Sequence, residues 1–154
     1  MNSLRRAAAA AALVLAVTGC SVRVGTPDST ASWYQETDTT LGAAVSGLGT
    51  AGLVLKNQDA GRLTRSYVVV AMRDTVEALN KETATYLAVQ PPASVAEQHR
   101  RAVAALTESL AVLTTASTAA SGSDRAARVR ALGQVRRTGH EVQDLQDQLA
   151  RSAP

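Results

Sequence analysis

Four segments of nearly equal length, each with an apolar residue at every third or fourth position, dominate this chain of 154 residues. That spacing gathers apolar side chains on one face of a helix. We expect helices at about 33–58, 62–89, 95–120 and 125–151, separated by connections of three to five residues. Helices about 40 Å long with such short connections must run antiparallel. The predicted fold is therefore all-α, an antiparallel up-down-up-down four-helix bundle.

Capping and turn residues indicate where these helices begin and end. Ser32-Trp33-Tyr34-Gln35 and Ser94-Val95-Ala96-Glu97 have the form of capping boxes, in which two side chains satisfy free backbone N–H groups at a helix start. Turn residues interrupt the helical pattern at Asp59-Ala60-Gly61, Pro91-Pro92 and Ser121-Gly122-Ser123.

Each helix is expected to bury one line of side chains. The chain contains no phenylalanine, so the core should be lean and the helices closely packed. The predicted lines are Tyr34, Leu41, Val45, Leu48, Gly52 and Leu55 in the first helix; Val69, Met72, Val76, Leu79, Thr83 and Tyr86 in the second; Val95, His99, Ala102, Leu106, Leu110 and Leu113 in the third; and Val129, Leu132, Val135, Gly139, Val142, Gln146 and Leu149 in the fourth.

The first twenty residues are typical of an exported chain. Arg5 and Arg6 precede an uncharged apolar run, 7–17, and two small residues separate that run from the only cysteine, Cys20. An uncleaved membrane anchor is the first alternative, but 7–19 supplies thirteen residues where a span needs about 20. A free or intermolecularly bridging thiol is the second alternative.

The residues around this cysteine resemble the type II signal peptide of bacterial lipoproteins. The lipobox of that class is a small aliphatic residue, two small residues and a cysteine, and Val17, Thr18, Gly19 and Cys20 match it position for position. The resemblance implies that a diacylglyceryl group is attached to Cys20, that the chain is cut before it, and that the new amino group often takes a further acyl chain such as palmitate. It also implies a location on the extracytoplasmic face of the cell membrane.

Three regions follow from this interpretation. Residues 1–19 are the cleaved signal peptide, 20–31 are the lipidated cysteine and a flexible tether, and 32–154 form the bundle. The mature chain holds 14 basic and 13 acidic residues, so nucleic acid is not an expected partner. With no second cysteine, no disulfide staples the domain.

Residues for catalysis or metal binding are sparse, and we expect no enzyme, cofactor or metal site. His99 and His140 fall at different levels on neighbouring helices, and no Glu-x-x-His or G-x-S-x-G pattern occurs. His99, with Tyr86 or Asp144 nearby, is a candidate ligand-binding or pH-sensitive group. A satisfied polar residue at a bundle end is the commoner interpretation.

The first helix contains an uncharged stretch, 39–55, with four glycines that include Gly49 and Gly52. Each interior glycine costs a helix about 0.5 to 1 kcal/mol relative to alanine, so the four call for a reason. A buried bundle helix is the favoured interpretation over a membrane-type helix pair, and either close packing inside the bundle or a groove for a partner helix would explain the glycines.

Arginines between residues 124 and 139, among them Arg125, Arg128 and Arg136, outnumber acids five to one. Such a patch suits anionic lipid headgroups, an envelope polymer or an acidic protein, whereas a solvated face is the usual explanation.

Three functional hypotheses remain. The leading one is a membrane-anchored, non-enzymatic module that binds another envelope protein. The second is a small-ligand or sensor bundle, and the third is a self-associating spacer. Pro91-Pro92 followed by His99 also resembles uncharacterised secreted helical proteins of high-GC bacteria, a resemblance that implies no function.

Overall fold

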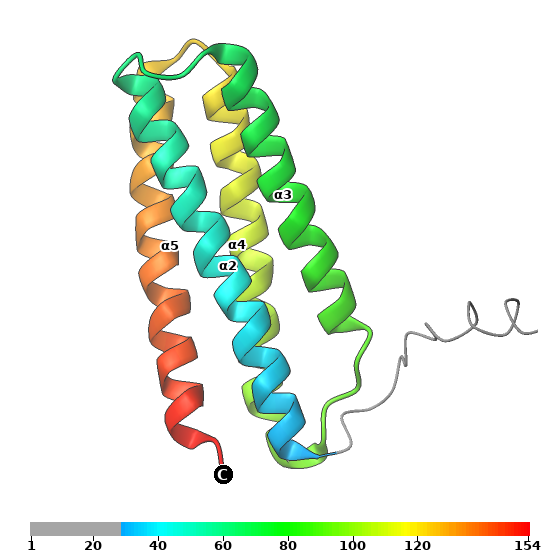
Figure 1. Ribbon diagram of the computed structural model, residues 1–154. Helices are drawn as coiled ribbons and strands as arrows, with labels where there is room; N and C mark the ends of the chain where they lie inside the picture. The colour runs from blue at the N-terminus through cyan, green and yellow to red at the C-terminus, as the bar shows by residue number, and fades with distance from the viewer. Residues whose placement is uncertain (1–28) are drawn as a thin grey trace, which may run out of the picture.

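The computed structural model describes residues 29–154, which form four long α-helices and one short 3₁₀ turn (Figure 1). The turn, η1 (Ala93–Val95), precedes the third long helix. The predicted signal peptide, lipobox and most of the predicted tether lie outside the described residues. The four helices are α2 (Thr30–Asp59), α3 (Arg65–Leu87), α4 (Ala96–Ser121) and α5 (Arg125–Ser152).

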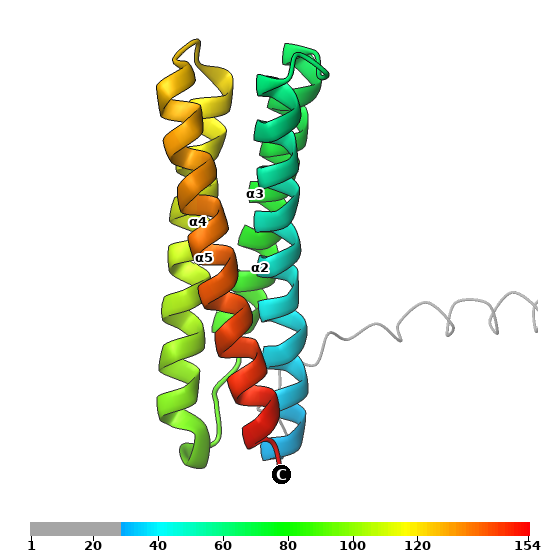
Figure 2. The same cartoon turned by 90° about the vertical axis from the view of Figure 1, so that its left-hand side faces the viewer.

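Successive helices run in opposite directions, as Figures 1 and 2 show. The connections 60–64 and 122–124 lie together at what we call the far end. The start of α2, the segment 88–95 and the C-terminus lie at the opposite, near end. Each helix packs against two neighbours, most extensively α2 against α5, and α2 also meets α4 across the diagonal. The predicted up-down four-helix bundle is confirmed.

The first helix begins earlier than predicted. Ser29, not Ser32, is the N-cap of α2: its hydroxyl accepts from the N–H of Ser32 at 3.1 Å, and the Ser32 hydroxyl accepts from the N–H of Ser29 at 3.3 Å. The predicted box with Gln35 was therefore wrong by one turn. Two serines three residues apart allowed either start, and the earlier one gives α2 a further turn to pack.

The predicted capping box at Ser94 was also wrong. Residues 93–95 form the 3₁₀ turn, and Val95 precedes α4 without a side-chain cap. The hydroxyl of Ser94 lies instead 3.2 Å from that of Thr30, which links the near ends of two helices. Side-chain caps do start α3, through Thr64, and α5, through Asp124.

The core follows the predicted lines with two exceptions. Val69 and Val129 are 40% and 54% exposed, so their placement in the core was wrong. Val68 is fully buried in place of Val69, because a run of three valines does not reveal which one faces inward. At the start of α5 the inward position belongs to Arg128, whose side chain is 15% exposed and paired.

Within residues 29–154, one helix has the length and composition of a membrane span. The segment 93–121, which is η1 and α4, contains a window with a mean hydropathy of 1.3. The buried core helix of a bundle passes the same test, and α4 packs against α2, α3 and α5. In the bundle 33% of that window is buried, so packing accounts for part of its apolarity.

Candidate functional site

The predicted site residues fall in three parts of the bundle. One pair meets at the near end, one pair lies at the far end, and three residues line a groove between α2 and α5. These sets are, in that order, His99 with Tyr86; Arg125 with Arg128; and Gly49 and Gly52 with Arg136.

His99 belongs to a polar cluster that joins three helices at the near end. The indole N–H of Trp33 on α2 donates to Nδ1 of His99 on α4 at 3.4 Å. The hydroxyl of Tyr86 on α3 lies 3.2 Å from the same nitrogen, and the two rings stack with their centroids 5.0 Å apart. Thr37 Oγ1 lies 3.0 Å from Tyr86 Oη. Because Trp33, Thr37 and Tyr86 are buried, the cluster is part of the packed interior.

The hydrogen bonds of this cluster select one protonation state. An indole N–H can only donate, so Nδ1 of His99 must offer a lone pair and the neutral ring carries its proton on Nε2. Burial lowers the pKa of His99, which favours the same neutral form. Burial raises the pKa of Tyr86, while its hydrogen bond with Thr37 acts in the opposite direction. The cluster is thus uncharged at neutral pH.

Asp144 does not join this cluster. Its side chain is exposed on α5, and none of the hydrogen bonds or ion pairs described for 29–154 includes it. Sequence reasoning missed Trp33 and Thr37, although their spacing of four residues places both on the helix face that meets Tyr86. Trp33 was the first residue of the predicted helix, and the earlier start of α2 places it one turn further in, where its side chain is buried.

The two far-end arginines share one carboxylate. Arg128 Nε lies 3.1 Å from Asp59 Oδ1, and Arg128 also donates to the carbonyl of Gly122 at 3.3 Å. Arg125 Nε lies 3.6 Å from Asp59 Oδ2, but its side chain is 78% exposed. Arg128 therefore ties the end of α2 to the start of α5, while Arg125 remains on the surface.

The predicted partner residues Gly49, Gly52 and Arg136 line a shallow groove of about 320 Å³ between α2 and α5. We call it the α2–α5 groove. Leu53 and Lys56 extend its α2 wall, and both are exposed. The structure thus unites two predictions that the sequence had left separate, the glycine-rich face and part of the arginine patch.

Close packing does not explain the glycines of α2. A Cβ atom at Gly52 would lie 3.7 Å from Val135, and one at Gly47 would lie 3.5 Å from Thr75, which are ordinary contacts. At Gly42 the nearest atom would be the side-chain nitrogen of Gln146, at 3.4 Å, and Gly49 has nothing within 4 Å. The favoured interpretation of α2 as a bundle helix is confirmed by its packing against α3, α4 and α5, but that packing does not require glycine, because the bundle has room for alanine at each position.

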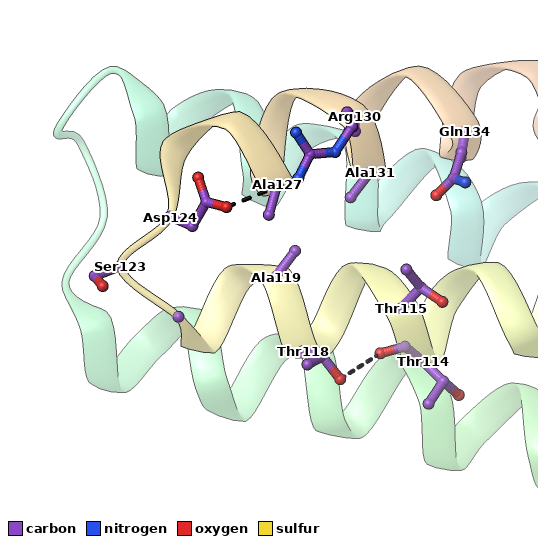
Figure 3. A pocket seen from close by; sticks show the side chains of 11 residues that line it. Thr114, Thr115, Thr118, Ala119, Ser123, Asp124, Ala127, Arg130, Ala131 and Gln134 are labelled. Carbon is purple, nitrogen blue, oxygen red and sulfur yellow. Dashed lines mark hydrogen bonds and ion pairs between the residues drawn. The ribbon is translucent and has the colours of Figure 1, made fainter.

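A wider hollow, of about 610 Å³, lies on the other side of α5, where it faces α4 near the far end. Figure 3 shows its alanines 119, 127 and 131, with threonines on α4 and Arg130 and Gln134 on α5. The hydroxyls of Thr114, Thr115 and Thr118 donate to carbonyls one turn earlier, and Arg130 lies 3.7 Å from Asp124. Most of its polar groups are thus already engaged within the protein.

Charge is divided along the bundle axis. Cutting each helix at its midpoint assigns 45–76 and 109–138 to the far half, which holds nine lysines and arginines against three acids. The near half, the rest of 29–154, holds four basic and nine acidic residues. Five of the six large apolar residues that are most exposed also lie in the far half: Leu53, Tyr67, Val69, Val70 and Val129.

Among residues 29–154, no group of three or more His, Cys, Asp or Glu side chains is placed to hold a metal ion. Comparison of the chain with protein-family models, curated proteins and solved structures finds no match.

Proposed function

We propose that this chain is a lipid-anchored module on the extracytoplasmic face of a bacterial cell membrane, which binds another envelope protein and catalyses no reaction. The proposal combines the lipobox that ends at Cys20 with the axial layout of the bundle.

The observation that carries the proposal is the separation between the start of the bundle and its basic surface. α2 begins at the near end, and its 30 residues extend about 45 Å to the far end. Ser29 lies nine positions after Cys20, a stretch that reaches at most about 30 Å. A bundle anchored in this way and standing upright presents its basic, partly apolar half to the space beyond the bilayer.

The sensor hypothesis has less support from the near-end cluster. Nδ1 of His99 is already engaged by Trp33 and approached by Tyr86, and the hydroxyl of Tyr86 lies within hydrogen-bonding distance of Thr37. A small ligand would have to displace these buried partners. The cluster is better explained as a polar tie among α2, α3 and α4.

Electrostatic repulsion argues against self-association of the bundle. Copies anchored in one membrane stand parallel, so the half with nine basic and three acidic residues would face its own equivalent. Like-charge surfaces repel each other, and the near halves would repel as well. A different protein is therefore the better partner.

Substitution of Cys20 tests the anchor. In the natural host, we expect the wild-type chain to fractionate with membranes and its N-terminal peptide to carry the mass of the acyl groups. Cys20→Ser should lose the acyl mass, while Ser21→Thr, which leaves the lipobox intact, should keep it. An unmodified N-terminal peptide in the wild-type protein would sink the proposal.

A further inference from the structure

The far half carries positive charge that the bundle itself does not neutralise. Each of its three acids already pairs with arginine: Asp59 with Arg125 and Arg128, Asp74 with Arg73, and Asp124 with Arg130. Within the described part of the chain, no ion pair joins a carboxylate to the five remaining basic side chains, which are Lys56, Arg62, Arg65, Arg136 and Arg137.

Apolar side chains accompany this charge. Leu53 is 63% exposed, the most of any large apolar residue described, and it shares the α2–α5 groove with Lys56 and Arg136. A hydrophilic anionic polymer would gain nothing from an exposed leucine. A protein segment gains from the exposed leucine and from the basic side chains. Apolar groups are buried at the centre of an interface, and ion pairs form at its rim.

The length of the chain before α2 argues against the membrane that holds the anchor as the partner. To point the far end at that membrane, the start of α2 would have to rise about 45 Å above it. The nine positions from Cys20 to Ser29 reach at most about 30 Å. A bundle lying flat on α2 and α5 would bring near-half acids of these two helices, such as Asp38 and Asp147, toward anionic headgroups as well.

We infer that the α2–α5 groove docks an acidic segment of a partner protein, with an apolar side chain of that segment against Leu53 and its carboxylates toward Lys56 and Arg136. This inference rests on the proposed function, because an extracytoplasmic anchor determines which surface faces away from the membrane. It adds the docking surface and the chemistry of the partner.

Photo-crosslinking in native membranes tests the inference on the full-length chain. A photo-reactive amino acid replaces Leu53, and a control chain carries it in place of Ala104, which is exposed in the near half. The test variant adds Lys56→Glu and Arg136→Glu. The matched variant adds Lys81→Glu and Arg151→Glu, which change the net charge equally at exposed near-half positions. Circular dichroism and thermal unfolding of each purified variant verify that the bundle is intact.

We expect position 53, and not position 104, to yield one protein adduct whose crosslinked peptide is rich in Asp and Glu and contains an apolar residue. The Lys56 and Arg136 reversals should reduce that adduct about tenfold or more, since each places like charges opposite one another, and the matched reversals should leave it within about twofold.

Three results would overturn the inference: an adduct with lipid or polymer only, a protein adduct insensitive to the Lys56 and Arg136 reversals, or no adduct from a chain that carries its acyl groups. A chain without acyl groups would instead refute the proposed function, so the two failures are distinguishable.

Discussion

Trp33 donates its indole N–H to Nδ1 of His99 over 3.4 Å, which requires the histidine to be neutral in the folded bundle. A proton on Nδ1 would set two donors against each other. Burial lowers the pKa of His99 below its ordinary value of 6.5, so the geometry and the pKa agree.

This arrangement predicts a loss of stability in acid. The unfolded chain binds a proton at His99 near pH 6.5, whereas the folded bundle binds it only at lower pH. The contribution of the neutral ring to the free energy of unfolding is therefore present above about pH 6.5 and is lost as the pH falls toward the folded-state pKa. Urea unfolding at pH 7.5 and pH 5 measures the loss.

The control for this prediction uses the second histidine, which is exposed on α5. His99→Asn retains an acceptor near the position of Nδ1 but does not titrate, so its stability should fall less between the two pH values than that of the wild type. His140→Asn should behave as the wild type does. Equal pH dependence in all three proteins would contradict the assignment of the stability loss in acid to His99.

A second prediction concerns the buried contact between Thr37 and Tyr86. Tyr86→Phe removes the hydroxyl that lies 3.0 Å from Thr37 Oγ1, and we expect a cost of about 1 to 2 kcal/mol in the free energy of unfolding. Thr37→Val combined with Tyr86→Phe should cost less than the two single changes together. Tyr67→Phe is the control, because Tyr67 is 57% exposed and should be neutral. Additive effects would argue against the bond.

The third prediction separates the two arginines on Asp59. Arg128 has a side chain 15% exposed and contacts both Asp59 and the carbonyl of Gly122, so Arg128→Met should cost about 1 to 2 kcal/mol in the free energy of unfolding. Arg125→Met should change it by less than about 0.5 kcal/mol, since that side chain is exposed. Chemical denaturation measures the free energy of unfolding of both variants. Similar losses for Arg125→Met and Arg128→Met would contradict the structure.

The fourth prediction concerns glycine. Gly49→Ala should stabilise the bundle by about 0.5 to 1 kcal/mol, because nothing lies within 4 Å of the added Cβ and alanine favours the helix. Gly61→Ala should destabilise it by about 1 kcal/mol, since φ is +68° at that position. Thermal unfolding measures both, and a destabilised Gly49→Ala variant would reveal a packing role that the bundle does not show.

The number, order and approximate lengths of the helices were predictable because apolar spacing and turn residues repeat through the whole chain. Helix starts were less predictable where two serines offered the same motif, as at Ser29 and Ser32. The phase of a helix was ambiguous within the valine run, where Val68 rather than Val69 faces inward. Tertiary packing resolved both ambiguities.

The site was predictable only in fragments. The proximity of His99 and Tyr86 followed from the alignment of helix ends, but Asp144 did not join them. The axial division of charge escaped notice because it is dispersed in the sequence: acids late in α5 meet acids early in α2 only once the helices stand antiparallel. Counting charge by half-helix from the predicted bounds would have revealed it.

The start of α2 and the C-terminus both lie at the near end, as Figure 1 shows. A fluorophore or affinity tag fused after Pro154 would therefore leave the far half unobstructed, and under the proposed anchoring at Cys20 it would lie beside the bilayer. A label at Ser123, in the connection between α4 and α5, would sit at the opposite end. Energy transfer from these two positions to a membrane dye would report whether the bundle axis is upright on the membrane or parallel to it.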